Sequence, residues 1–190
     1  MIFVAGSEKQ GARMTHARDA EEQLAGFIAK FTPAIGSRAV AIRAEMRKRY
    51  PMANELVYDN YNALAIGYGP SEKASDAVFS IALYPRWVSL FFLQARGLPD
   101  PHRVLKGSGN VVKHIVLPSP DALDQPEIQA LMREAVARAT VRFNPQNPHR
   151  LIIKSISPKQ RPRRPAPEKA SRIHGESRPS ARKRAGASAQ

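Results

Sequence analysis

The sequence predicts an α+β domain in which an antiparallel sheet of about five strands is covered by helices from both ends of the domain, followed by a disordered tail. Three observations predict this fold. Apolar residues repeat with helical spacing near the start of the chain and again near residue 130, alternate with strand spacing in between, and nearly vanish after residue 156. The short connections between the predicted strands favour antiparallel pairing, because parallel pairs need long crossovers.

Two amphipathic helices open the predicted domain. The first begins at His16, and Pro33 separates it from the second. Each has apolar residues three or four positions apart along one face. These residues are Leu24, Phe27, Ile28 and Phe31 in the first helix, and Ile35, Ala39, Ile42 and Met46 in the second. Pro51 ends the second helix, because the residue before a proline is disfavoured in the helical conformation.

The centre of the chain predicts strands. Period-two alternation and β-branched or aromatic residues mark residues 56–58, 64–68, 77–84, 87–93 and 111–117. Only Pro85 and Arg86 separate the third and fourth of these strands, which predicts a tight hairpin. A last helix is predicted over residues 126–140. Beyond it, residues 151–153 either add a short edge strand or pack on the surface.

The predicted domain covers residues 16–156, with residues 1–15 and 157–190 disordered. Pro, Arg, Lys, Ala and Ser dominate the C-terminal segment, a composition that buries too little apolar surface to offset its ordering entropy. The net charge of +14 is concentrated there, with ten Lys and Arg against two Glu between Ser157 and Gln190. Such cations neutralise phosphates without reading bases. The predicted contacts to nucleic acid are Arg161, Arg163, Arg164, Arg182, Lys183 and Arg184.

The composition also excludes sites that require cysteine and segments that span a membrane. The chain has no cysteine, which excludes disulfides, thiolate metal clusters and a cysteine nucleophile. No apolar stretch approaches the roughly 20 residues of a membrane-spanning helix, and the apolar start lacks a basic flank and the length of a signal peptide. We therefore expect a cytoplasmic protein without a membrane partner. The oligomeric state is not specified.

Several short motifs resemble the YdhG-like family, a domain of unknown function. They are Leu83-Tyr84, the strand 88–92, Gly97-Leu98-Pro99-Asp100-Pro101, Leu105-Lys106-Gly107-Ser108-Gly109, and Lys113-His114-Ile115. Pro51 and Glu55 resemble the end of the helix that opens the family domain. Asn110 and His114 depart from the lysine and arginine that are commoner there. The resemblance covers residues 21–140 and implies an α+β fold with an antiparallel sheet.

One branch of that family is linked to iron delivery, but this domain is net basic, and iron prefers oxygen ligands. We therefore predict no metal site and no cofactor. The loop of residues 99–110 is the best candidate for a ligand, because glycines expose its backbone beside cations. The predicted anion-binding residues are Arg103, Lys106, Gly107, Gly109, Lys113 and His114. Asp100, between two prolines, is expected to fix a turn.

The sequence thus leaves three functions open. The first is a non-enzymatic binding module for a small anion or metal, and the second is a nucleic-acid-associated protein that uses its basic tail. The third is an enzyme with a site around residues 99–110, although the nucleophile-elbow, P-loop and dinucleotide signatures are all absent and no catalytic residue is predicted. The aromatic residues are expected to pack in the core or at its rim. Among the aromatic residues of the predicted strands and their turns, Arg86-Trp87 is the one adjacent basic–aromatic pair suited to stacking on nucleic acid.

Overall fold

The computed structural model describes residues 18–166. Two helices come first, residues 18–29 and α2 (Pro33–Arg49), and five strands follow: β1 (Asn54–Asp59), β2 (Leu64–Gly69), β3 (Phe79–Leu83), β4 (Val88–Phe92) and β5 (Lys113–Leu117). Helix α3 (Pro126–Ala137) and strand β6 (Leu151–Ile156) complete the domain. Two short 3-10 helices, η1 (Ala74–Asp76) and η2 (Pro120–Asp124), lie in connections. The predicted α+β class is confirmed.

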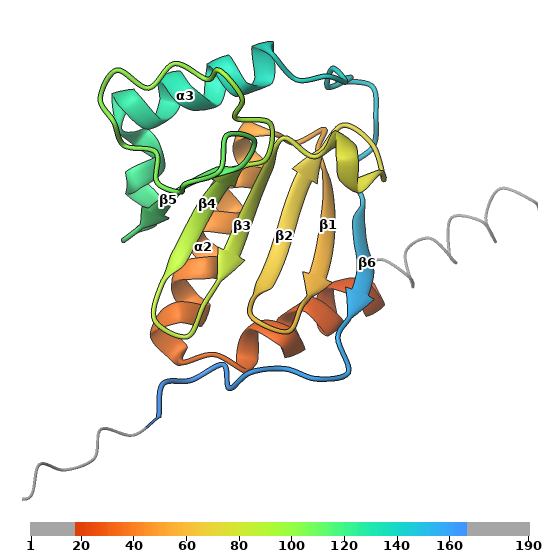
Figure 1. Cartoon of the computed structure of the whole chain (residues 1–190). Helices are drawn as coiled ribbons and strands as arrows, with labels where there is room; N and C mark the ends of the chain where they lie inside the picture. The colour runs from red at the N-terminus through yellow and green to blue at the C-terminus, as the bar shows by residue number, and fades with distance from the viewer. Residues whose placement is uncertain (1–17, 167–190) are drawn as a thin grey trace, which may run out of the picture.

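The sheet is six-stranded and mixed, in the order β5-β4-β3-β2-β1-β6. Neighbouring strands from β1 to β5 pair antiparallel, as predicted, and Tyr84 donates its backbone N–H to Trp87 O at 2.9 Å to close the predicted β3–β4 hairpin. The prediction of about five antiparallel strands is wrong at one edge, where β6 pairs parallel to β1. The chain returns there only after α3 and a long connection, the kind of crossover that permits parallel pairing (Figure 1).

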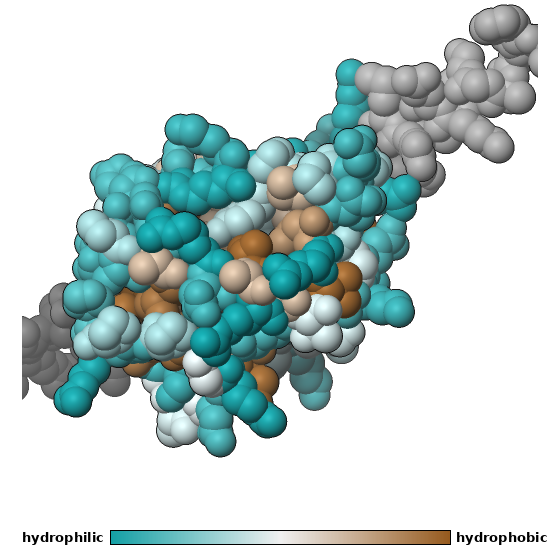
Figure 2. Space-filling view, turned by 90° about the horizontal axis from the view of Figure 1, so that it is seen from above, coloured by the Kyte–Doolittle hydropathy of each residue, from teal (hydrophilic) through white to brown (hydrophobic). Residues whose placement is uncertain are grey.

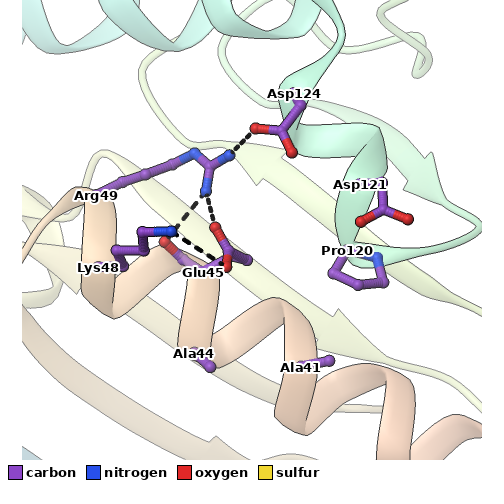
Figure 3. A pocket seen from close by; sticks show the side chains of 8 residues that line it. All are labelled: Ala41, Ala44, Glu45, Lys48, Arg49, Pro120, Asp121 and Asp124. Carbon is purple, nitrogen blue, oxygen red and sulfur yellow. Dashed lines mark hydrogen bonds and ion pairs between the residues drawn. The ribbon is translucent and has the colours of Figure 1, made fainter.

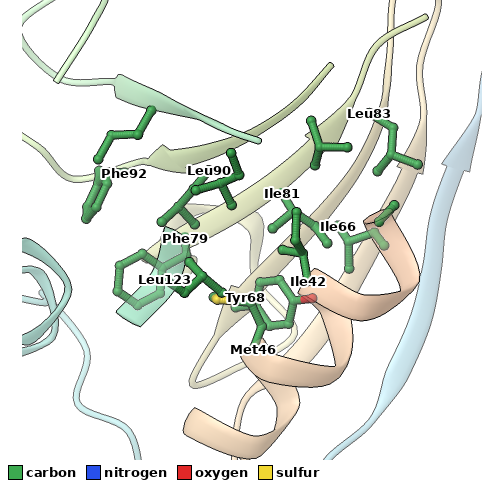
Figure 4. Close-up of a cluster of buried hydrophobic side chains, with 14 of the residues drawn as sticks. Ile42, Met46, Ile66, Tyr68, Phe79, Ile81, Leu83, Leu90, Phe92 and Leu123 are labelled. Atoms are coloured by element: carbon green, nitrogen blue, oxygen red, sulfur yellow. The ribbon is translucent and has the colours of Figure 1, made fainter. Parts of the chain in front are cut away.

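Helix α2 covers one face of the sheet (Figure 1), which we call the inner face. Thr32 caps α2 by accepting a hydrogen bond from the Ile35 N–H at 3.4 Å, and the basic residues 47–49 occupy its last turn. One register row on the inner face consists of the buried residues Val57, Ile66, Ile81, Leu90 and Ile115. Figure 4 shows Ile42 and Met46 of α2 packed among these strands, with Leu123 of η2 beside them.

The opposite face, which we call the outer face, carries smaller residues along its middle. One of its register rows reads Tyr58, Ala65, Ala82, Ser89 and Val116. Part of this face is covered by the segment after η1. A Cβ at Gly69 would lie 2.9 Å from Ala77 Cα, so only glycine permits this approach of two backbones. The rest of the outer face toward β4 and β5 has no helix over it (Figure 1).

The C-terminal boundary differs from the prediction. Residues 157–166, expected to be the start of a disordered tail, lie against the domain, and Arg163 is only 5% exposed. Residues 1–15 and 167–190, for which disorder was also predicted, lie outside the described residues. His16, the predicted start of the domain, lies outside them as well.

The surface at the end of the domain that carries α3 is mostly hydrophilic. Figure 2 shows this end, with hydrophobic residues in small separate areas between the hydrophilic ones. Within residues 18–166 no helix is long and apolar enough to cross a membrane.

Candidate functional site

The predicted anion loop begins with a tight turn built on Asp100. Its carboxylate accepts hydrogen bonds from the N–H groups of Val104 at 3.0 Å and Leu105 at 2.9 Å, and its carbonyl accepts from the Arg103 N–H at 3.1 Å. The expectation that Asp100 fixes a turn is therefore confirmed. Arg103, at the exposed tip, has φ 54°, a left-handed conformation that is uncommon for residues other than glycine.

The chain then returns to the edge of the sheet. Lys106 and His114 exchange two backbone hydrogen bonds, of 2.8 and 3.0 Å, and so add an isolated bridge alongside β5. Gly107 follows with φ 112°, which an L side chain rarely adopts. Lys113 Nζ donates to Gly107 O at 2.5 Å and closes the loop from the strand side. The structure thus brings Lys106, Gly107, Lys113 and His114 together.

The other two predicted residues are placed differently. The side chain of Arg103 is exposed and makes no hydrogen bond or ion pair with another described residue. Gly109 has no positive φ, and a Cβ there would meet only Val112 O at 3.7 Å, an ordinary contact. Gly109 is therefore not required by the backbone, whereas Gly107 is.

The charge of this loop is not neutralised within the described part of the chain. Arg103, Lys106 and Lys113 form no salt bridge with a described carboxylate, and the only acid of the loop, Asp100, already accepts two N–H groups. Burial and then the nearby charge of Lys106 hold the pKa of His114 below its usual range. Residues 107–110 are exposed, and their N–H groups make no hydrogen bond to a described residue. The loop therefore combines cationic side chains with backbone donors that no described residue pairs.

A surface pocket of about 620 Å³ lies between α2 and η2 (Figure 3). Its lining residues are Ala41, Ala44, Glu45, Lys48, Arg49, Pro120, Asp121 and Asp124. Arg49 donates to Glu45 and to Asp124 at 2.5 Å each, so the charges of this pocket are largely paired with one another. No local pattern in the sequence indicates this pocket, since Arg49 and Asp124 in its two walls are 75 residues apart in the chain.

Two buried carboxylates on β1 are a second feature that sequence reasoning missed. Glu55 is fully buried and accepts two hydrogen bonds from Arg43, at 2.9 and 2.6 Å, while Arg43 also donates to Glu21 at 2.8 and 2.9 Å. These bonds lower the pKa of Glu21. His149 Nε2 lies 3.6 Å from Glu55. The signal in the sequence was the pair of acids four residues apart, which places both on one face of a strand.

The second of these carboxylates, Asp59, corrects the prediction for the basic segment. Arg163 donates to Asp59 at 2.8 Å and also binds Asn60 O, and Lys30 binds the other carboxylate oxygen of Asp59 at 2.7 Å. Arg163 is therefore a buried structural residue and is not available to a phosphate. The equally buried carboxylate offsets part of the cost of desolvating this charge, while Nε and Nη1 of Arg163 have no hydrogen-bond partner among the described residues.

The neighbours of Arg163 are also engaged. The guanidinium of Arg161 lies 5.5 Å from the centre of the Tyr61 ring. Arg164 donates to the carbonyls of Ala29 and Lys30, at the end of the first helix, at 3.3 Å each. A cation at that position complements the helix dipole. The other predicted nucleic-acid contacts, Arg182, Lys183 and Arg184, lie outside the described residues.

Comparison with known proteins gives no match. No family model matches the chain, and no curated protein or solved structure is significantly similar to it. The resemblance to the YdhG-like family therefore stays a prediction from the sequence. Among residues 18–166 there is also no group of three His, Asp or Glu side chains arranged to hold a metal ion.

Proposed function

We propose that this protein is a non-enzymatic binding module that binds an anion at the loop of residues 103–114. The observation that carries the proposal is the combination of three cationic side chains, on Arg103, Lys106 and Lys113, with a run of backbone amide donors in exposed residues, none of them paired with a described carboxylate. Elsewhere in the described chain, buried cations such as Arg43 and Arg163 have carboxylate partners. Positive potential without a partner favours an anionic ligand.

Binding is favoured over catalysis because the loop lacks the partners that acid–base chemistry needs. His114 has a lowered pKa, but its ring stacks on Phe91 with centroids 5.1 Å apart. Asp100, which lies just before this loop, holds the turn and makes no bond to that ring. A general base oriented by a carboxylate is therefore not assembled at this loop within the described part of the chain.

The test is a titration of the full chain with tripolyphosphate and sulfate, followed by calorimetry and by NMR of the loop amides. We expect Lys106→Ala and Arg103→Ala each to weaken binding about three- to tenfold, the value of one charge-assisted contact. Thermal stability should change little, since neither side chain is packed. Lys73→Ala, an exposed lysine in another loop, is the matched control and should bind as the unmodified protein does. Unchanged affinity in both loop variants would place the site elsewhere.

We propose a second, independent role in nucleic-acid binding for the basic segment, restricted to residues 167–190. The anchoring of Arg161, Arg163 and Arg164 supports this restriction, and the sequence beyond them has six Lys and Arg against two Glu and no aromatic residue. Removal of residues 167–190 should reduce both duplex-DNA affinity and its salt dependence, by a log–log slope of roughly 0.9 for each phosphate that is no longer neutralised. An unchanged slope in the truncated protein would contradict this role.

A further inference from the structure

The outer face of the sheet carries two stacked ring pairs that the core does not use. At the β3–β4 hairpin, Tyr84 and Trp87 are stacked with centroids 5.2 Å apart, and Trp87 is 42% exposed. At the other end of β4, Phe91 and His114 are stacked with centroids 5.1 Å apart and both are half-buried. Strand alternation puts Trp87 and Phe91 on the outer face, because Val88, Leu90 and Phe92 belong to the inner core.

Small side chains lie between the two ring pairs. Ser89 lies between Trp87 and Phe91 on the same face of β4, and its register partners are Ala82 and Val116. Ser89 Oγ is buried and has no hydrogen-bond partner among the described residues. Trp87 and Phe91 are four residues apart, so their positions on the strand are separated by roughly 13 Å. Ser89 and Ala82 are themselves buried, at 0% and 4% exposure, so the groups that this part of the face offers to a ligand are the rings, above all the 42% exposed Trp87.

Charge decides which flat ligand fits this face. None of the residues that β2, β3, β4 and β5 place on the outer face is acidic. Arg86 is exposed in the hairpin turn next to Trp87, and Lys106, the bridge partner of His114, lies beside the Phe91–His114 pair. Aromatic rings in line on an open sheet with cations at both ends are complementary to bases linked by phosphates.

We propose that the outer face between Trp87 and His114 binds single-stranded nucleic acid. Bases stack on the two ring pairs, and the phosphates are neutralised by Arg86 at one end and by the loop cations at the other. Single strands are favoured over duplexes because side chains on a flat sheet reach bases only when those bases are unstacked from a partner strand. This inference rests on the proposed anion loop and names its ligand as the phosphodiester backbone.

Trp87 is the only tryptophan of the chain, so its fluorescence reports on this surface alone. The experiment titrates the full chain with a 12-residue oligo-uridine, a 12-residue oligo-thymidine and a 12-base-pair duplex, and measures fluorescence quenching together with anisotropy of labelled strands. We expect saturable quenching by the single strands. The basic segment beyond residue 166 contains no aromatic residue whose fluorescence could be quenched. The fluorescence signal therefore distinguishes binding at the outer face from binding to the basic segment.

Trp87→Leu and Phe91→Leu should each weaken single-strand binding about five- to tenfold, the effect of removing one base–ring stack, and should leave duplex binding unchanged. Tyr61→Leu is the matched control, because the Tyr61 ring is 48% exposed but lies in the turn between β1 and β2. The affinity of this variant for single strands should not change. Circular dichroism melting shows whether each variant folds. If Phe91→Leu does not fold, the proposal is still tested by the affinity of Trp87→Leu, measured by anisotropy, and by the quenching of Trp87 in the unmodified protein.

The failure of this inference and the failure of the proposed function are distinguishable. If Lys106→Ala weakens tripolyphosphate binding while both ring variants bind single strands normally, the anion loop stands and this inference is overturned. If tripolyphosphate binding is unaffected by the loop variants, the proposed function, anion binding at the loop, is overturned. If light scattering shows a dimer that Trp87→Leu dissociates, a second copy of the chain occupies the outer face, and this also overturns the inference.

Discussion

Two groups of arginines and lysines that look alike in the sequence have opposite roles in the fold. Arg163 is buried, donates to the equally buried Asp59 and fastens residues 157–166 to the domain. Arg103 and Lys106, in contrast, are exposed in a loop and pair with no described carboxylate. The net charge of a segment therefore does not show which of its cations are available to a ligand. Availability depends on whether a carboxylate far away in the chain is folded against them.

The largest expected effect concerns the buried group. Asp59→Ala leaves the charge of Arg163 buried without its carboxylate, so the free energy of unfolding should fall by about 3–5 kcal/mol. Urea unfolding measures this change. The matched control is Glu72→Ala, which breaks the exposed pair with Arg150 and should cost at most about 1 kcal/mol. Equal losses in the two variants would show that the Asp59 pair is not the anchor.

Removing a buried cation and removing the exposed loop cations should affect different properties of the protein. Arg163→Ala should lower stability by more than about 1 kcal/mol, because a buried hydrogen-bonded cation is removed, and should leave sulfate affinity unchanged. The Arg103→Ala, Lys106→Ala double variant should keep stability within about 0.5 kcal/mol and lose most of its sulfate affinity. Calorimetric titration and thermal melting of both proteins test this reversal. If one variant lost both properties, the proposed separation of structural and ligand-binding cations would be wrong.

Anion binding at the loop should also depend on pH, through His114. The pKa of His114 is lowered by burial and by Lys106, so the ring is neutral at pH 7 in the free loop, and a bound anion should raise its pKa. Sulfate affinity should then increase as the pH falls from 7 toward about 5.5. An NMR titration of the His114 ring with and without sulfate measures the two pKa values. His114→Gln should remove this dependence, and a bound-state pKa no higher than the free one would contradict it.

The ion network on β1 responds at lower pH. Hydrogen bonds from Arg43 lower the pKa of Glu21, so the stability this carboxylate contributes is present above its unfolded value of 4.5 and is lost as the pH falls through the lower folded value. The side chain is 40% exposed, so solvent screening keeps this contribution below about 1 kcal/mol. Glu21→Gln should therefore flatten the decline of stability below about pH 5. Unfolding curves over this acidic range give the comparison, and parallel curves would contradict it.

The smallest effect belongs to the backbone of the loop. Arg103 has a left-handed φ of 54°, so Arg103→Gly should relieve strain and gain up to about 1 kcal/mol of stability while it weakens anion binding. Arg103→Ala keeps the strain and serves as the control, with the same reduction in binding and no gain. A melting temperature no higher for the glycine variant would show that the turn stores no strain.

Local patterns predicted most of the fold. The helical spacing of Ile35 to Met46 defined α2 and its buried face, and Pro85-Arg86 marked the hairpin, because both signals involve neighbours in the chain. Asp100 between two prolines likewise indicated its turn correctly. The sixth strand and its parallel pairing were not determined by residues 151–153 alone, since a short apolar run fits an edge strand or a surface contact equally well.

The sequence by itself determined the α+β class, the inner core and the concentration of glycines and cations in the loop before β5. Only the tertiary structure decided which cations remain free and which faces remain open. Asp59 and Arg163 are 104 residues apart, and no periodicity relates them. The ring pairs on the outer face likewise depend on the register of β3, β4 and β5. Periodicity reports which side of an element a residue occupies, whereas the partner of a buried charge and the cover over a sheet face are set by segments distant in the chain.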